Sequence, residues 1–147
     1  MRTVDTRQYV SMLRELVREG NEVSMLITGS SMSPFLLSHK DTICFKAPQR
    51  PLRRGDMVFY ERSTGQFVMH RIYKVRKNGL YIVGDAQKDI EGPVDPVQVF
   101  AVVTKVNRRG QWVGPGNFWW EFYEHIWIRL VFFRPVIFRL YHLLMKK

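Results

Sequence analysis

The chain has 147 residues and a formal net charge of +10, from 23 Lys and Arg residues against 13 Asp and Glu residues. This length suits one domain with a buried core, and the charge favours an anionic partner such as nucleic acid or lipid headgroups. The single cysteine, Cys44, excludes an internal disulfide. We expect Cys44 to be a small core residue, because its neighbours alternate in polarity as in a strand.

Residues 1–22 are predicted to form a short N-terminal helical segment. Apolar side chains recur at helical spacing between Thr6 and Glu19, and Gly20-Asn21 is a typical helix stop. The segment lacks the apolar run of a secretory signal, so we expect no export signal in it.

Residues 23–117 are predicted to form a small, mainly β domain with mostly antiparallel strands. Short runs with period-two polarity alternate with turn sequences such as Lys77-Asn78-Gly79, which is typical of hairpins. Many short strands of this kind favour an all-β architecture. The predicted strands cover residues 23–27, 42–46, 57–61, 67–76, 80–83 and 97–106, with a polar loop over 84–96.

Residues 118–147 differ in kind, since aromatic and aliphatic side chains lie opposite a charged side when the segment is laid out as a helix. The uncharged stretches are far shorter than the ~20 residues that span a bilayer. We expect two basic amphipathic helices, meeting at Arg134-Pro135, that lie in a membrane interface. Packing of the apolar side on the β domain and a distorted span are the alternatives. The residues expected at the membrane are Trp119, Trp120, Trp127, Phe133, Arg134 and Tyr141.

We further expect that deletion of residues 118–147 would release the protein from membranes and leave the β domain folded.

The turn Thr28-Gly29-Ser30-Ser31-Met32-Ser33-Pro34 contains the candidate nucleophile, Ser31. A serine in such a turn is most often only a turn residue. Here Gly29 permits a sharp turn, Pro34 rigidifies it and Met32 can anchor it in the core. The result is a fixed hydroxyl beside backbone N–H groups, which is what an oxyanion hole requires.

His70 is the best candidate for the base that a serine nucleophile needs, because it lies within a predicted strand that has apolar same-face neighbours. A histidine there is more often a satisfied core residue. Asp85 or Asp89, in the loop after the next strand, could orient the ring. We expect activity to rise near pH ~6.5, where an ordinary neutral imidazole forms.

Together the Gly-x-Ser-Met-x-Pro turn, Arg54-Gly55-Asp56, His70-Arg71-Ile72 and Gly84-Asp85 resemble the signal peptidase I family over residues 23–106. The likeness is to its Ser–His branch, which includes the endoplasmic-reticulum and archaeal enzymes. The larger branch and the related self-cleaving SOS repressors have Lys where this chain has His70.

The resemblance implies that Ser31 attacks the scissile carbonyl and His70 takes its proton. It favours Asp89 as the orienting acid, with Asp85 the second choice, and the Ser31 N–H as oxyanion donor. Some members have a Ser hydroxyl where this chain has Gly29, and Ser30 is an uncertain substitute. The resemblance implies no metal or organic cofactor.

The sequence therefore predicts a membrane-associated serine endopeptidase that cleaves leader or signal-type peptides. The family's usual N-terminal anchor is missing, so we expect a peripheral enzyme, by default on the cytoplasmic side, attached to anionic lipid through residues 118–147. The alternatives are a non-catalytic adaptor on the same fold and a self-processing regulator. Nucleic-acid binding is disfavoured, because the basic loop residues accompany no nucleic-acid motif.

Overall fold

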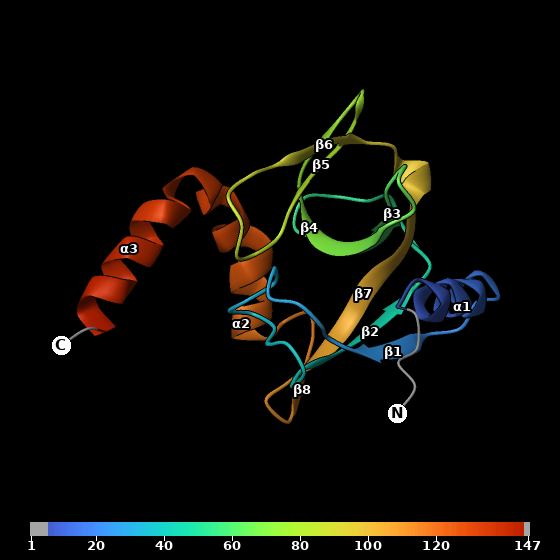
Figure 1. The fold of residues 1–147 in the computed structure, drawn as a ribbon, viewed down its shortest axis with the longest axis horizontal. Helices are drawn as coiled ribbons and strands as arrows, with labels where there is room; N and C mark the ends of the chain where they lie inside the picture. Colours follow the sequence, from blue (N-terminus) through green and yellow to red (C-terminus); the bar gives the residue numbers. More distant parts are fainter. Residues whose placement is uncertain (1–5, 146–147) are drawn as a thin grey trace.

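A computed structural model describes residues 6–145 of the chain. The element order begins with one helix and a run of short strands (Figure 1). The bounds are α1 Thr6–Arg18, β1 Val23–Leu26, β2 Thr42–Lys46, β3 Met57–Glu61, β4 Phe67–Arg76, β5 Gly79–Val83, β6 Glu91–Val94, η1 Pro96–Gln98, β7 Val99–Arg108 and β8 Gln111–Val113. The chain then continues through α2 Phe118–Glu121, η2 Phe122–Ile126, η3 Trp127–Phe133 and α3 Arg134–Met145.

The strands form one antiparallel sheet in the order β1-β2-β7-β3-β4-β5-β6, and β8 folds back on β7. The mainly β fold predicted from the sequence is confirmed. Register shifts between Cys44 and Phe45 and between Phe59 and Tyr60 mark bulges, which bend strands and increase their twist. Figure 1 shows the resulting curvature of the sheet.

Period-two alternation predicted the bounds of β2, β3 and β4, but it did not reveal β6 or β8. Strand β6 contains Gly92-Pro93, residues that disfavour a central strand and are tolerated at an edge. Among residues 6–145, β6 pairs only with β5. Strand β8 has three residues, too few to show an alternation. Cys44 is buried in β2, as expected.

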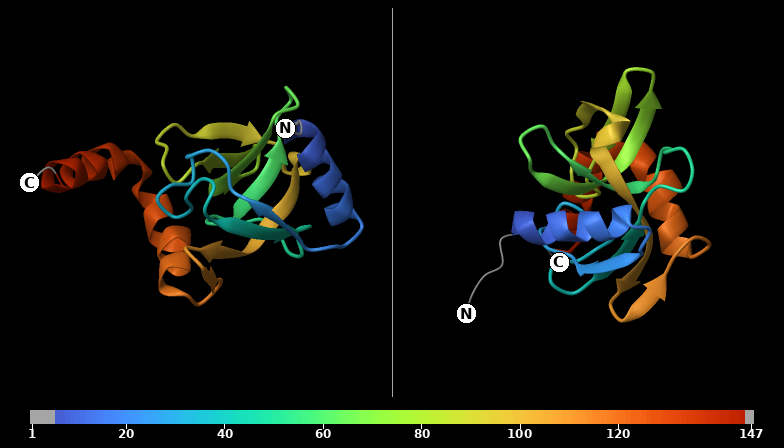
Figure 2. Two further views of the ribbon diagram at one scale, coloured as in Figure 1. Left: turned by 60° about the horizontal axis from the view of Figure 1, so that its bottom comes forward. Right: turned by 90° about the vertical axis from the view of Figure 1, so that its right-hand side faces the viewer.

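Helix α1 packs its apolar side on the sheet, against β1 and β7 (Figure 2). Val10, Leu13 and Val17 are buried and belong to one core cluster with Phe45 and Phe59. The N-terminal segment is therefore part of the domain's core.

The segment after residue 117 also enters this core. The Asn117 side chain caps α2 by accepting hydrogen bonds from the Trp119 and Trp120 N–H groups. Trp120 and Trp127 are each 7% exposed and pack in the main cluster with Tyr123. The assignment of Trp120 and Trp127 to a membrane surface is thus wrong, and the boundary expected at residue 118 does not separate two packing units.

Arg134 is the third residue whose membrane assignment the structure corrects, since its side chain is fully buried. Its guanidinium donates hydrogen bonds to the carbonyls of Gly84, Gln87 and Trp127, and it lies over the Trp127 ring. Deletion of residues 118–147 would remove these contacts and part of the core, which argues against the expectation that the β domain would stay folded without them.

Helix α3 begins at Arg134, with Pro135 in its first turn, where the missing N–H is tolerated. The helix extends away from the sheet, as Figure 1 and the left view of Figure 2 show. Trp119, Phe133 and Tyr141 are exposed and stay candidates for a membrane surface. Within residues 6–145 no helix has the length and hydropathy needed to cross a membrane.

Candidate functional site

A cavity of about 730 Å³ brings Ser31 and His70 together, although they come from different parts of the sheet. The turn after β1 supplies Ser31 and Met32, and β4 supplies His70. The remaining wall combines apolar and polar side chains. The apolar ones are Val10, Met25, Ile27, Phe59, Phe67, Val68 and Met69, and the polar ones are Thr28, Arg62, Thr64, Gln66 and Gln87.

The turn that carries Ser31 is held from both ends. The Gly29 N–H donates to the Ser38 hydroxyl at 3.0 Å, with Gly29 at φ +82°, a conformation that glycine adopts without strain. The Ser33 N–H donates to the Ser30 carbonyl at 3.1 Å. Met32 is 2% exposed, so it anchors the turn in the core as the sequence predicts.

Two arginines of the β7–β8 hairpin support the same turn from outside the cavity. Arg108 donates to the Phe35 carbonyl at 2.6 Å, and Arg109 donates to the carbonyls of Phe35 and Pro34. Pro34 itself is exposed. These contacts give Arg108 and Arg109 a structural role on the turn.

The Gly84-Asp85 loop docks directly on the Ser31 backbone. The Ala86 N–H donates to the Ser31 carbonyl at 2.8 Å. A Cβ atom at position 84 would lie 2.5 Å from that carbonyl oxygen, so only glycine allows this approach. The Ser31 N–H has no hydrogen-bond acceptor among residues 6–145, which leaves it available to an oxyanion.

His70 lies in the middle of β4, opposite Val58 of β3, and is 6% exposed. Burial, followed by the Arg62 charge, lowers the pKa of His70 to about 4, against the opposing effect of Glu91 and Asp85. The ring is therefore neutral at pH 7, as a general base must be. The pKa of ~6.5 expected from the sequence is too high, because that value describes a solvated imidazole.

Asp85 is fully buried and is committed to another partner. Its two carboxylate oxygens accept hydrogen bonds from Nε and Nη2 of Arg71, each at 2.9 Å, and Arg71 Nη1 donates to the Gly55 carbonyl. Asp85 therefore holds Arg71, the neighbour of His70 in β4. The structure favours a bracing role for it over that of orienting acid.

Asp89 is exposed and lies with His70 at a second cavity, of about 540 Å³. No hydrogen bond of the described residues joins Asp89 to His70, or Ser31 to His70. The structure thus brings Ser31, His70 and Asp89 to adjoining cavities that both contact the His70 ring. Among residues 6–145, neither candidate acid is hydrogen-bonded to His70.

Sequence reasoning missed Arg62 and Glu91 beside His70. Arg62 lines both cavities, and Glu91 accepts hydrogen bonds from Arg62 and from the Tyr60 hydroxyl. Their charges act on His70 in opposite directions. Glu91 lies on the edge strand β6, and because that strand carried no sequence signal its approach to β4 was not foreseeable.

The two candidate acids should differ sharply when each is replaced. We expect Asp85→Asn to lower the free energy of unfolding by about 3–5 kcal/mol, because it leaves the buried Arg71 guanidinium without its counter-charge. The matched change Asp89→Asn should alter it by about 0.5 kcal/mol or less, since Asp89 is exposed. Urea unfolding of both variants measures this, and equal effects would contradict a bracing role for Asp85.

Comparison of the chain with protein-family models, curated proteins and solved structures gave no match, so the case for the site stands on its residues and geometry.

Proposed function

We propose that the protein is a serine endopeptidase of the signal-peptidase type, with Ser31 as nucleophile and His70 as base. The observation that carries the proposal is the cavity that the Ser31 turn and the buried His70 share. The Ser31 N–H, which has no acceptor among residues 6–145, adds a backbone donor on the same residue. Residues of the motifs that resemble the signal peptidase I family also meet in space. Gly84-Asp85 contacts Ser31, and Asp85 pairs with Arg71.

In the proposed reaction the Ser31 hydroxyl attacks the scissile carbonyl as His70 accepts its proton. The Ser31 N–H donates to the developing oxyanion. Protonated His70 then gives the proton to the leaving amine. A water molecule, deprotonated by His70, hydrolyses the acyl-enzyme. The nucleophile–base hydrogen bond would form in the substrate complex, as such bonds often tighten only there.

The substrate proposed is a leader or signal-type peptide presented at an anionic membrane surface. The apolar side chains in the wall of the Ser31–His70 cavity suit the apolar side chains of an extended peptide. Helix α3 supports the membrane part, because its exposed apolar side chains accompany the exposed Arg139. Pro135 and Phe138 of α3 line the second cavity at His70, so a membrane that contacts α3 would lie near the site.

Replacement of either member of the Ser–His pair should abolish cleavage. We expect Ser31→Ala and His70→Gln to lower kcat/KM by about a thousandfold or more, since each removes a group that acts in the chemical step. The measurement is mass spectrometry of a leader-peptide library incubated with each variant and anionic lipid.

Ser24→Ala and His39→Asn are the matched controls. Both residues are exposed and line neither cavity, and Asn tolerates the positive φ of His39. Cleavage that persists in Ser31→Ala would overturn the assignment of Ser31 as the nucleophile. A wild-type protein that binds these peptides without cutting any of them would support a non-catalytic adaptor.

The lowered pKa of His70 predicts an unusual pH profile. Neutral His70 predominates above pH about 4, so kcat/KM should be near its plateau at pH 5.5, where an ordinary histidine would retain about a tenth of it. Folding must be monitored in parallel. The pKa of His70 is lower in the folded protein than in the unfolded chain, so only the unfolded chain binds a proton there between pH about 6.5 and 4. The free energy of unfolding therefore falls as the pH drops through this range. If kcat/KM instead falls with a midpoint near pH 6.5 while the protein stays folded, the lowered pKa of His70 is contradicted.

The exposed face of α3 should determine membrane binding. We expect the double variant Leu140→Glu, Leu144→Glu to weaken co-flotation with anionic vesicles about tenfold or more. Both side chains are exposed on α3, and inserting the two new carboxylates into the lipid would be unfavourable. Two Glu introduced elsewhere, at Val97 and Val75, are the control for the change in net charge. Equal losses in both proteins would show that net charge alone governs binding.

A further inference from the structure

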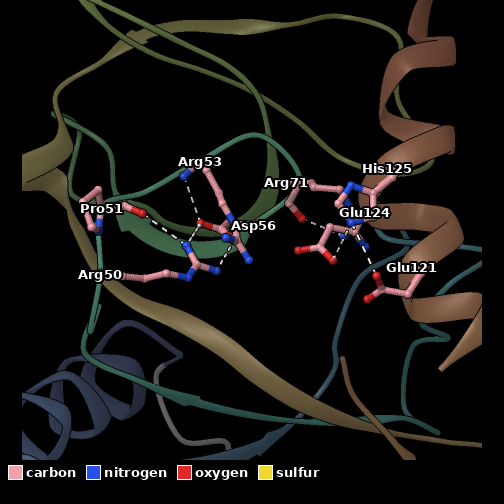
Figure 3. A network of polar contacts seen from close by, with 9 residues as sticks. Arg50, Pro51, Arg53, Asp56, Arg71, Glu121, Glu124 and His125 are labelled. Atoms are coloured by element: carbon pink, nitrogen blue, oxygen red, sulfur yellow. Dashed lines mark hydrogen bonds and ion pairs between the residues drawn. The ribbon is translucent and has the colours of Figure 1, made fainter. Parts of the chain in front are cut away.

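A second group of reactive side chains lines a separate cavity of about 430 Å³, which shares no residue with the Ser31–His70 cavity. Glu121 ends α2, and Glu124 and His125 follow in η2, a π-helical turn. Such turns are frequent at functional sites. Figure 3 shows the three side chains gathered beside one another.

The spacing of the three side chains suits a metal ion. One ligand atom from each lies within 4.8 Å of the others. His125 Nε2 is 3.5 Å from a Glu121 oxygen and 3.4 Å from a Glu124 oxygen. A tetrahedral zinc ion with bonds of about 2.0–2.1 Å separates neighbouring ligand atoms by about 3.4 Å. Two of the three separations therefore already have the value that zinc imposes.

Glu124 supplies a second observation, because its side chain is only 10% exposed and lines this cavity. Among residues 6–145, the basic group within 4.0 Å of its carboxylate is the His125 imidazole of the same cluster. Gly55 packs closely against it, since a Cβ atom at position 55 would lie 2.6 Å from Glu124 Cγ. A cation bound between the three side chains would offset the cost of burying this carboxylate.

The nearest arginines do not supply that cation. Arg50 makes a bidentate pair with Asp56, at 2.8 and 2.9 Å, and Arg53 also points its backbone N–H at Asp56. In Figure 3 these residues face Asp56, apart from the Glu121–His125 group. Asp56 thus balances the charge of these arginines. The carboxylates of Glu121 and Glu124 are left with the His125 imidazole as their shared partner.

We propose that Glu121, Glu124 and His125 bind one Zn²⁺ ion, with the fourth position open to the cavity and taken by water. One imidazole and two carboxylates are ligands that zinc accepts, and three protein ligands with an open position are common for it. All three ligands belong to α2 and η2, so the ion would hold this irregular turn in the shape seen here.

Titration of the full chain with Zn²⁺ alone, after treatment with a chelator, tests the site. We expect calorimetry to show one Zn²⁺ ion bound per chain, and the unfolding temperature to rise with Zn²⁺. Co²⁺ bound at the same site should give a visible absorption band that disappears when Zn²⁺ replaces Co²⁺. Glu124→Gln and His125→Ala should each weaken Zn²⁺ binding at least tenfold, with circular dichroism confirming the fold. His142→Ala, which removes an exposed histidine of α3, should bind as the wild type does.

Glu121→Gln and His125→Ala decide the matter if Glu124→Gln does not fold, because Glu121 and His125 are partly exposed, with side chains 42% and 56% accessible. Wild-type protein that binds no stoichiometric Zn²⁺ would overturn the proposal and leave His125 as a polar contact between the two carboxylates. Wild-type affinity in His125→Ala would place any bound ion elsewhere.

Discussion

The buried pair of Arg71 and Asp85 is the interaction on which the candidate site depends. Arg71 follows His70 in β4, and Asp85 lies in the loop after β5 that docks on the Ser31 carbonyl. Both side chains are at most 1% exposed, so the pair acts where solvent screening is weak. Each group would be costly alone in the core, and together they set the distance between the strand of the base and the turn of the nucleophile.

Arg134 holds the same loop from the other side. It donates to the carbonyls of Gly84 and Gln87, while the Trp127 indole N–H donates to the Asp85 carbonyl at 2.8 Å. The segment that leads into α3 is therefore part of the support for the Ser31 turn. This connection joins the proposed membrane helix to the proposed catalytic pair through a few directed hydrogen bonds.

Each carboxylate near His70 either forms an ion pair with an arginine or is exposed to solvent. Asp85 pairs with Arg71, Glu91 pairs with Arg62, and Asp89 faces solvent. Burial keeps His70 neutral without help from an acid, which fits a Ser–His pair more closely than a triad. A low pKa makes the imidazole a weaker base, so the proposed chemistry relies on proximity and on the Ser31 N–H as much as on base strength.

Local pattern was enough to predict α1, the strands β2, β3 and β4, and the Ser31 turn with its Met32 anchor, because polarity period and turn chemistry act between residues close in the chain. The pairing of Ser31 with His70 followed from the position of His70 in a predicted strand and from the motif resemblance. The sequence could not assign Asp85 to Arg71, nor Glu91 to Arg62, since those contacts arise only when strands β4, β5 and β6 lie side by side. Nor could it place Trp120, Trp127 and Arg134. An amphipathic segment can bury its apolar side either in a membrane or against its own domain, and both remove that side from water. Only the tertiary structure shows that Trp120 and Trp127 pack in the core and that Arg134 donates hydrogen bonds to three backbone carbonyls, because these partners come together only when the chain folds.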